Sequence, residues 1–322
     1  MTATSLTDLL RDDMAEVDRV IRASLHSDVV LIRQVAEYII AGGGKRLRPA
    51  MVVLCANALG YRGHYHHELA AVVEFIHTAT LLHDDVVDAS DLRRGRPTAN
   101  VEFGNAASVL VGDFLYSRAF QMMVTVQNMH VMEVLSDATT VISEGEVLQL
   151  MNCHDPDIEV DNYLQVIRYK TAKLFEASSR LGAIISGAGD EVEAALGRYG
   201  MHLGTAFQLV DDVLDYSGDS DQTGKNVGDD LAEGKPTLPL LHVMRTGTPE
   251  QATTVREAII NGSVDQFDAI MAAVRATGAL DYTRECARRE AELAVAELTC
   301  LPDSVYKQAL LELPAFAVER DR

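Results

Sequence analysis

The chain has 322 residues, 48% of them hydrophobic, which is ample for a large core, and no low-complexity tract indicates disorder beyond the ends. Its formal net charge of −20 argues against nucleic acid or an anionic membrane surface as a main partner. No apolar run reaches the roughly 18 residues of a membrane span, and the acidic amphipathic N-terminus is not a signal peptide. Four cysteines, far apart in the sequence, are expected to be buried and reduced, which favours a cytoplasmic location.

Apolar residues recur at helical spacing through nearly the whole chain, and strand-like alternation is weak everywhere. The spacing predicts helices over 9–21, 29–40, 49–59, 67–88, 106–126, 131–151, 162–187 and 191–216, and shorter helices over 238–313. We therefore expect an all-α fold, with residues 1–322 forming one bundle of about a dozen helices around a deep central cavity.

The densest basic stretch, GGGKRLRP, occupies residues 42–49. Glycines allow the backbone to approach a ligand closely, and the start of a helix favours anions. Lysine offers a point charge and arginine a two-pronged donor, and together these suit a diphosphate. The stretch lacks the spacing of the nucleotide-binding glycine-rich loop.

An acidic motif occurs twice, each time at the end of a predicted helix: DDVVD at 84–88 and DDVLD at 211–215. Positions i and i+4 share one helix face, so Asp84 and Asp88 point the same way, as do Asp211 and Asp215. Two like charges about 4 Å apart cost roughly 4 kcal/mol at an effective dielectric near 20. Mg²⁺ removes that cost, because it is commonly held by one or two carboxylates plus substrate phosphates. One such motif is more often a solvated acidic face, whereas two near-copies favour a diphosphate site.

Further cations lie close to the acidic motifs. Arg93 and Arg94 follow the first motif in RRGRP, which is either a solvated basic loop or a pair that reaches the same metal-bound phosphate. Lys170, Lys225 and Lys235 would each be read alone as surface lysines, but their placement matters in so acidic a chain. Residues 217–236 are polar and rich in Gly and Asp, typical of a surface loop or of a lid that closes over a charged substrate.

With these pieces assembled, the sequence resembles the trans-prenyl diphosphate synthases over nearly its whole length, and most closely the bacterial octaprenyl diphosphate synthases. The stretches that carry the resemblance are EFIHTATLLHDDVVD, FGNAASVLVGDF, EGEVLQLMN, GTAFQL and GKNVGDDLAEGKPTLPLLH. The resemblance implies the isoprenoid synthase fold, a homodimer, and two or three Mg²⁺ in each active site. It also implies the condensation of an allylic diphosphate, farnesyl diphosphate being the expected starter, with several isopentenyl diphosphates. The long all-trans product, of octaprenyl length, would pass to membrane enzymes for a quinone side chain.

The resemblance also assigns roles to residues. Asp84 and Asp88, with Asp85 nearby, would hold Mg²⁺ on the allylic diphosphate, and Asp211 and Asp215, with Asp212, would hold a further Mg²⁺ there. The residues that would contact the allylic diphosphate are Arg93, Lys170, Thr171, Gln208 and Lys225. Those that would bind isopentenyl diphosphate are Lys45, Arg48, His77 and Arg94, and Lys235 and the C-terminal arginines are further candidates.

Product length is expected to depend on the helix turn before the first acidic motif. Ala79 and Thr80 are small, and a bulky side chain there would block a growing tail roughly 6–8 Å from the metal. Because the resemblance associates an aromatic residue here with short products, the small residues predict a long product. The tunnel floor would come from Phe120, Met122 and Met123 or from residues 129–132, although these could equally be ordinary core residues.

Three other functions fit parts of the sequence. A His-Asp phosphohydrolase would use the dipeptide His83-Asp84, but the second motif has Val210 at the position of His83. A terpene cyclase shares one DDxxD motif but does not need its duplication or the GGGKRLRP loop. A non-catalytic helical subunit would tolerate broken acidic motifs, whereas both are intact here.

Overall fold

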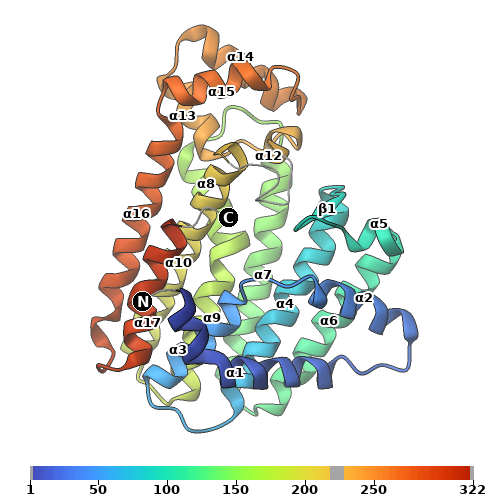
Figure 1. Cartoon of the computed structure of the whole chain (residues 1–322), viewed down its shortest axis with the longest axis vertical. Coiled ribbons are helices and arrows are strands. Elements are labelled where there is room, and N and C mark those ends of the chain that lie inside the picture. The colour runs from blue at the N-terminus through green and yellow to red at the C-terminus, as the bar shows by residue number, and fades with distance from the viewer. Residues whose placement is uncertain (1–2, 218–227, 320–322) are drawn as a thin grey trace. The chain divides into compact units, whose positions relative to one another are not determined.

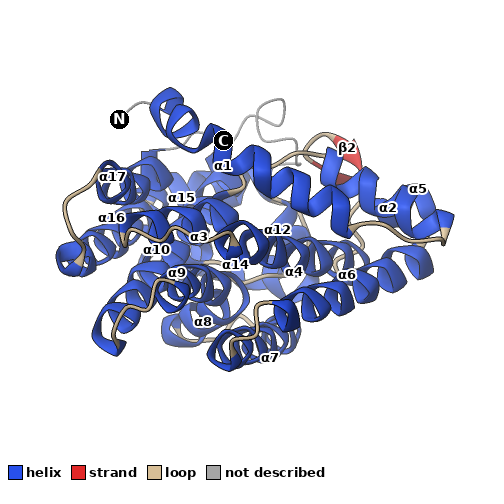
Figure 2. Cartoon of the chain, turned by 90° about the horizontal axis from the view of Figure 1, so that it is seen from below, coloured by secondary structure: helices blue, strands red, loops and turns tan. Residues whose placement is uncertain are grey.

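The computed structural model describes residues 3–217 and 228–319, and nearly all of its regular structure is helical (Figures 1 and 2). The predicted all-α fold is confirmed. The chain forms two compact units, each assembled from three segments. Unit 1 comprises Met1–Thr139, Leu174–Gly200 and Glu297–Glu312, and unit 2 comprises Thr140–Lys173, Met201–Ala296 and Leu313–Arg322. The single domain and the central cavity stay predictions.

Unit 1 contains the N-terminal helices and a small hairpin. Its elements are α1 (Ala3–Ser24), α2 (Val30–Ala41), α3 (Leu47–Ala58), α4 (Tyr65–Val87), β1 (Leu92–Arg93), β2 (Arg96–Pro97), α5 (Ala99–Phe103) and α6 (Asn105–Thr125). It also holds parts of α7 (Met129–Asn152), α9 (Lys173–Ile185), α10 (Asp190–Ser217) and α17 (Val305–Glu319), and the 3-10 helix Leu298–Cys300.

The core of unit 1 is built on α3 and α4. Every residue from Pro49 to Ala56 is buried, and the proline lies in the first turn of α3, where its missing N–H leaves no helical hydrogen bond unmade. Helix α4 packs against α1, α3 and α6. Ser108 on α6 donates a hydrogen bond of 2.9 Å to the carbonyl of Leu82 on α4, which satisfies a buried hydroxyl at this contact.

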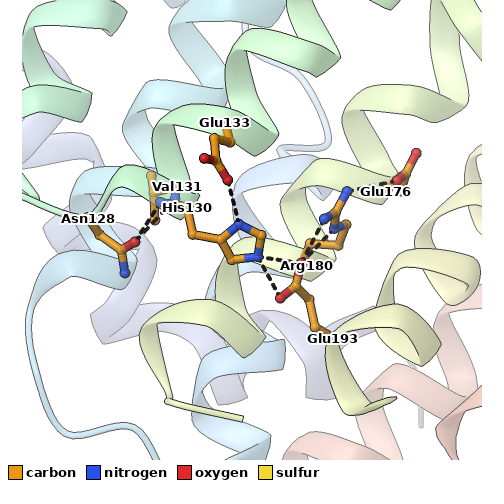
Figure 3. Close-up of polar contacts among 7 residues, drawn as sticks. All are labelled: Asn128, His130, Val131, Glu133, Glu176, Arg180 and Glu193. Carbon is orange, nitrogen blue, oxygen red and sulfur yellow. Dashed lines mark hydrogen bonds and ion pairs between the residues drawn. The ribbon is translucent and has the colours of Figure 1, made fainter. Parts of the chain in front are cut away.

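A polar network joins the unit 1 portions of α7, α9 and α10 (Figure 3). The buried carboxylate of Glu193 accepts hydrogen bonds from Nη2 of Arg180 at 2.7 Å and from Nε2 of His130 at 2.8 Å. The bond to Glu193 raises the pKa of His130. A carboxylate can be buried here because a guanidinium and an imidazole replace its water.

Unit 2 contains the remaining elements. They are α8 (Val160–Ile167), a π-helix (Arg168–Ala172), α12 (Asp229–Ala232), α13 (Leu238–Thr246), α14 (Pro249–Asn261), α15 (Phe267–Ala276) and α16 (Ala279–Glu297), with the rest of α7, α10 and α17. One core cluster gathers around Tyr216, Ile259 and Ile270, and another around Tyr163 and Leu209. These clusters bury the end of α10, so they position the second acidic motif.

The structure differs from the sequence-based expectation at three places. The helix predicted over 162–187 is interrupted by the π-helix, and the RRGRP segment, for which a basic loop is one interpretation, forms most of the hairpin β1–β2. Cys55 is buried as predicted, but Cys300 is exposed, so the prediction of buried thiols is wrong there. None of the described helices combines the length and apolar content that a membrane crossing requires.

Close packing of α9 against α3 predicts a stability effect at Gly182. A Cβ added there would lie 2.5 Å from Cβ of Cys55 and 2.8 Å from the backbone nitrogen of Ala56, and backbone cannot move aside cheaply. We expect Gly182→Ala to lower the free energy of unfolding by about 1–3 kcal/mol, measured by urea denaturation.

Gly197→Ala is the matched control, because Gly197 is also helical and gains the same helix propensity. Its new Cβ would meet only side-chain carbons of Arg180 and Glu176, the nearest at 3.2 Å. Equal stability of the two variants would contradict the packing argument.

Candidate active site

The first acidic motif lies at the C-terminal end of α4. Asp88 follows the last helical residue, and its N–H donates to the carbonyl of Asp84 at 2.8 Å, so the helical spacing is kept through the motif. Asp84 and Asp88 are partly exposed, whereas Asp85 is fully buried. The structure therefore separates the middle aspartate from the two that share a helix face.

Asp85 is held by Arg93. Nε and Nη2 of the guanidinium donate to Oδ1 of Asp85 at 2.9 and 2.6 Å. Oδ2 of Asp85 is buried and accepts no hydrogen bond from any residue that the structure describes. This pair fixes Arg93 next to Asp84 and Asp88, so the middle carboxylate positions an arginine rather than facing solvent.

The hairpin explains how two adjacent arginines reach different places. Leu92 pairs with Pro97 and Arg93 with Arg96, which leaves Arg94 and Gly95 as a two-residue turn. Both turn residues have positive φ, 54° and 72°, as in the type I′ turns that close tight hairpins. Arg93 therefore faces α4, while Arg94 stands at the tip of the turn.

The glycine-rich loop lies against that tip. A Cβ added at Gly44, whose φ is +154°, would lie 2.9 Å from Nη1 of Arg94. Arg46 takes a left-handed conformation at φ 49° and pairs with Glu74 and Asp18, each at 3.4 Å. Glycine at position 44 thus allows the guanidinium to rest on the backbone of the basic loop.

His77 lies among these cations. Nη1 of Arg48 is 3.2 Å from Nε2 of His77, and the guanidinium of Arg48 covers the ring of Phe175 at 4.4 Å. Burial, followed by the charge of Arg48, holds the pKa of His77 well below its ordinary value. The imidazole is therefore neutral and can accept the hydrogen bond from Arg48.

Positive charge predominates around His77. The cations whose charge acts on the imidazole are Arg46, Arg48, Arg93 and Arg94, and Lys45 is exposed beside them in sequence. The carboxyl of Glu74 faces three of these arginines, yet burial raises its pKa. Such a concentration of cations in an acidic chain suits an anionic ligand.

The second acidic motif, in unit 2, has a different arrangement. Asp212 is buried; its Oδ2 accepts a hydrogen bond from the hydroxyl of Tyr163, and its Oδ1 accepts one from Nε2 of Gln208 at 3.0 Å. Gln208 in turn accepts a bond from Thr171 at 3.0 Å. Burial, and next the charge of Asp230, raise the pKa of Asp212 to about 7.

The π-helix places two predicted residues beside this chain of bonds. Lys170 and Thr171 both belong to it, and Nζ of Lys170 donates to Oε2 of Glu146 at 2.6 Å. A Cβ added at Gly145 would lie 2.6 Å from the nitrogen of Lys170, so α7 and the π-helix touch at their backbones. A widened turn is common where a helix serves a functional site.

Two further lysines complete the predicted set. Lys235 is partly buried and forms an ion pair with Glu233. Lys225 and half of the predicted lid, residues 218–227, lie outside the residues that the structure describes, and part of the other half forms the short helix α12.

The structure adds residues that sequence reasoning missed. Tyr163 and Glu146 contact predicted site residues, and Glu74 pairs with Arg46 of the basic loop. Glu146 and Glu74 lie in stretches noted beforehand, EGEVLQLMN and EFIHTATLLHDDVVD, whereas Tyr163 does not. His83 contacts the carbonyl of Val109 at 3.1 Å and lies 3.4 Å from Asp113, both on α6. This orientation does not favour a His-Asp phosphohydrolase.

The carboxylates of both motifs fit Mg²⁺ by their chemistry, since hard oxygen ligands are what this ion prefers. In the described part of the chain, three metal-ligating side-chain atoms come together only at Asp13, His66 and His67. Neither acidic motif is therefore a preformed protein cage. A site of two carboxylates completed by water and phosphate oxygens matches the way Mg²⁺ is usually bound.

Comparison with known proteins extends these observations. Residues 29–275 match the family model described as Polyprenyl synthetase. The chain is 55% identical to the octaprenyl diphosphate synthase of Escherichia coli strain K12, with both chains covered completely. It is 47% identical to an all-trans-nonaprenyl-diphosphate synthase of Rhodobacter capsulatus over 96% of this chain and 95% of that one.

Solved structures of similar proteins share the fold of this chain. A polyprenyl synthase from Caulobacter crescentus, complexed with calcium and isoprenyl diphosphate, is 47% identical and superposes with a TM-score of 0.96 over 99% of this chain and 98% of that one. A heptaprenyl diphosphate synthase from Staphylococcus aureus is 28% identical, with a TM-score of 0.92 over 97% of this chain and 99% of that one.

The raised pKa of Asp212 predicts how stability depends on pH without metal. A carboxyl whose pKa is higher folded than unfolded stabilises the fold fully below its unfolded pKa, and loses this contribution as pH rises through about 7. We expect the wild-type protein in chelator to lose about 2–3 kcal/mol of unfolding free energy, relative to Asp212→Asn, between pH 5 and 8.

Urea denaturation across that pH range measures the effect. Asp155→Asn, which changes an exposed carboxyl, serves as the control and should track the wild type. Parallel pH curves for wild type and Asp212→Asn would show that Asp212 titrates normally.

Proposed function

This chain belongs to the polyprenyl synthetase family of trans-prenyltransferases, and we propose that it extends an allylic diphosphate with isopentenyl diphosphate units to an all-trans product of octaprenyl length. Farnesyl diphosphate is the proposed starter. The observation that carries the proposal is the group of four arginines around a neutral His77, beside the acidic end of α4. That arrangement suits a diphosphate more than any neutral or cationic ligand.

We propose that isopentenyl diphosphate binds to the basic loop and the hairpin tip. Lys45, Arg48 and Arg94 would supply charge, and Gly44 would let the diphosphate approach the backbone. His77 would hold Arg48 in place as a neutral acceptor, because a protonated imidazole there would be repelled by its arginine neighbours. Glu74 would keep Arg46 oriented through their contact at 3.4 Å.

The allylic diphosphate is proposed to bind where the two acidic motifs supply Mg²⁺ ligands. Asp84 and Asp88 would hold the ion of one motif, and Asp211 and Asp215 that of the other, with two or three ions in total. When bound, Mg²⁺ acts as a Lewis acid that stabilises the charge growing on the departing diphosphate. Arg93, kept in position by Asp85, would add a guanidinium to that charge.

Residues of unit 2 are proposed to position the same diphosphate. Lys170 is oriented by Glu146 and supplies a cation, and Lys225 and Lys235 are proposed as further ones. Thr171 and Gln208 hold Asp212 through their chain of hydrogen bonds, which keeps the acidic end of α10 rigid. The departing diphosphate is proposed to take the proton released when the new carbon–carbon bond is completed.

Cellular context is proposed from the same family. The exposed apolar residues Val109 and Leu110 on α6 and Val101 on α5 fit a second copy, so we propose a homodimer. The four cysteines form no disulfide, which fits a reducing cytoplasm. A product with so long an apolar tail is proposed to pass to membrane enzymes that build a quinone side chain.

The direct test is synthesis by the purified chain. With Mg²⁺, farnesyl diphosphate and labelled isopentenyl diphosphate, we expect a product of octaprenyl length, sized by chromatography. Asp84→Ala should lose at least about 10³-fold of turnover, because a metal ligand is removed. Full turnover by Asp84→Ala, or release of phosphate without chain growth, would contradict the proposal.

Gly44→Ala should raise the KM for isopentenyl diphosphate about tenfold or more, because its Cβ displaces Arg94. Gly43→Ala is a close control: Gly43 also has positive φ, +73°, but a Cβ there meets nothing within 4 Å. If the two variants showed the same KM, backbone strain rather than Arg94 would be the cause.

Product length provides a separate test. Ala79 and Met123 are fully buried on α4 and α6, which pack together, and Thr80 is partly buried. We propose that the tail runs past Ala79 and Thr80 toward Met123. Ala79→Phe should then shorten the product, as read by chromatography, while Ala79→Ser should not. An unchanged product from Ala79→Phe would show that the tail takes another course.

A further inference from the structure

A second group of potential metal ligands lies at the opposite end of α4 from the acidic motif. Asp13 on α1 and His66 and His67 at the start of α4 each offer one ligand atom, and these three atoms lie within 4.8 Å of one another. His67 is separated from Asp84 by seventeen positions, or about 26 Å along the helix. The group is therefore distinct from the site proposed for the diphosphates.

The distances within the group match a metal site. Nε2 of His67 lies 2.8 Å from Oδ1 of Asp13, and Nε2 of His66 lies 3.6 Å from the same oxygen. With bonds of about 2.0–2.1 Å, two ligands of a tetrahedral Zn²⁺ are about 3.3 Å apart. The two observed distances bracket that value, so small side-chain movements suffice to admit the ion.

The surroundings of the group also favour a bound cation. Nδ2 of Asn57 donates to Oδ2 of Asp13 at 3.0 Å, which holds the carboxylate with Oδ1 turned toward the histidines. His66 is only 5% exposed, so its imidazole presents Nε2 to Asp13 from the interior of the unit.

We propose that Asp13, His66 and His67 bind one transition-metal ion of the Zn²⁺ class, with water as the fourth ligand, and thereby clip α1 to α4. Two imidazoles and one carboxylate suit Zn²⁺ and its first-row neighbours, whereas Mg²⁺ prefers a set made only of oxygens. The partial exposure of Asp13 and His67 leaves a path for the ion and its water. The role is structural, since the ion would join two helices far from the acidic motif.

The test uses Co²⁺ and Zn²⁺ on the full chain, stripped with chelator and then supplied with excess Mg²⁺ to occupy the acidic motifs. We expect one Co²⁺ to bind with the visible absorption of a four-coordinate ion, Zn²⁺ to displace it, and Zn²⁺ to raise the Tm. Asp13→Asn and His67→Gln should each weaken binding at least tenfold and abolish the rise in Tm. Synthase activity of His67→Gln in Mg²⁺ should stay unchanged.

His202→Gln is the matched control, because His202 also pairs with a carboxylate, Glu290 at 2.6 Å, but has no second histidine beside it. His67→Cys should retain Co²⁺ binding and add a sulfur-to-cobalt charge-transfer band. This variant tests the site even if His67→Gln fails to fold. The proposal is overturned if wild type binds no Co²⁺ above the Mg²⁺ background. Equal binding by wild type, Asp13→Asn and His67→Gln would overturn it as well.

Discussion

The buried pair of Asp85 and Arg93 is the contact on which the rest of the first acidic motif depends. A carboxylate with no exposed surface costs several kcal/mol unless a partner replaces its water. Arg93 does so with two hydrogen bonds, and this ties the end of α4 to the hairpin β1–β2. The tight turn then carries the next arginine, Arg94, to the glycine-rich loop. One buried pair therefore sets the place of two cations.

Repulsion among those cations explains the state of His77. Arg46, Arg48, Arg93 and Arg94 all act on its imidazole, so a further positive charge there is disfavoured and the ring stays neutral. An anionic ligand would relieve the mutual repulsion of the arginines, which favours ligands with multiple negative charges. The net charge of −20 does not oppose this, because short-range fields decide binding once a ligand is close.

The two copies of the acidic motif are alike in sequence but not in environment. The middle aspartate is buried in both, yet Asp85 is bound by a guanidinium, whereas Asp212 is bound by the hydroxyl of Tyr163 and the amide of Gln208. Burial, and next the charge of Asp230, raise the pKa of Asp212. The middle carboxyl of the first copy thus holds an arginine in place. The charge of the middle carboxyl of the second copy depends instead on pH or on a bound metal.

The sequence alone determined the helical class, most helix boundaries and the positions of the acidic and basic motifs, because helical periodicity and charge spacing are local properties of the chain. It predicted that Asp84 and Asp88 share a face, which follows from 3.6 residues per turn. Only the tertiary structure decided that Asp85 turns inward to Arg93, that Tyr163 and Glu146 hold Asp212 and Lys170, and that Asp13 meets His66 and His67. These contacts join residues from separate elements, and no local pattern encodes which elements come together.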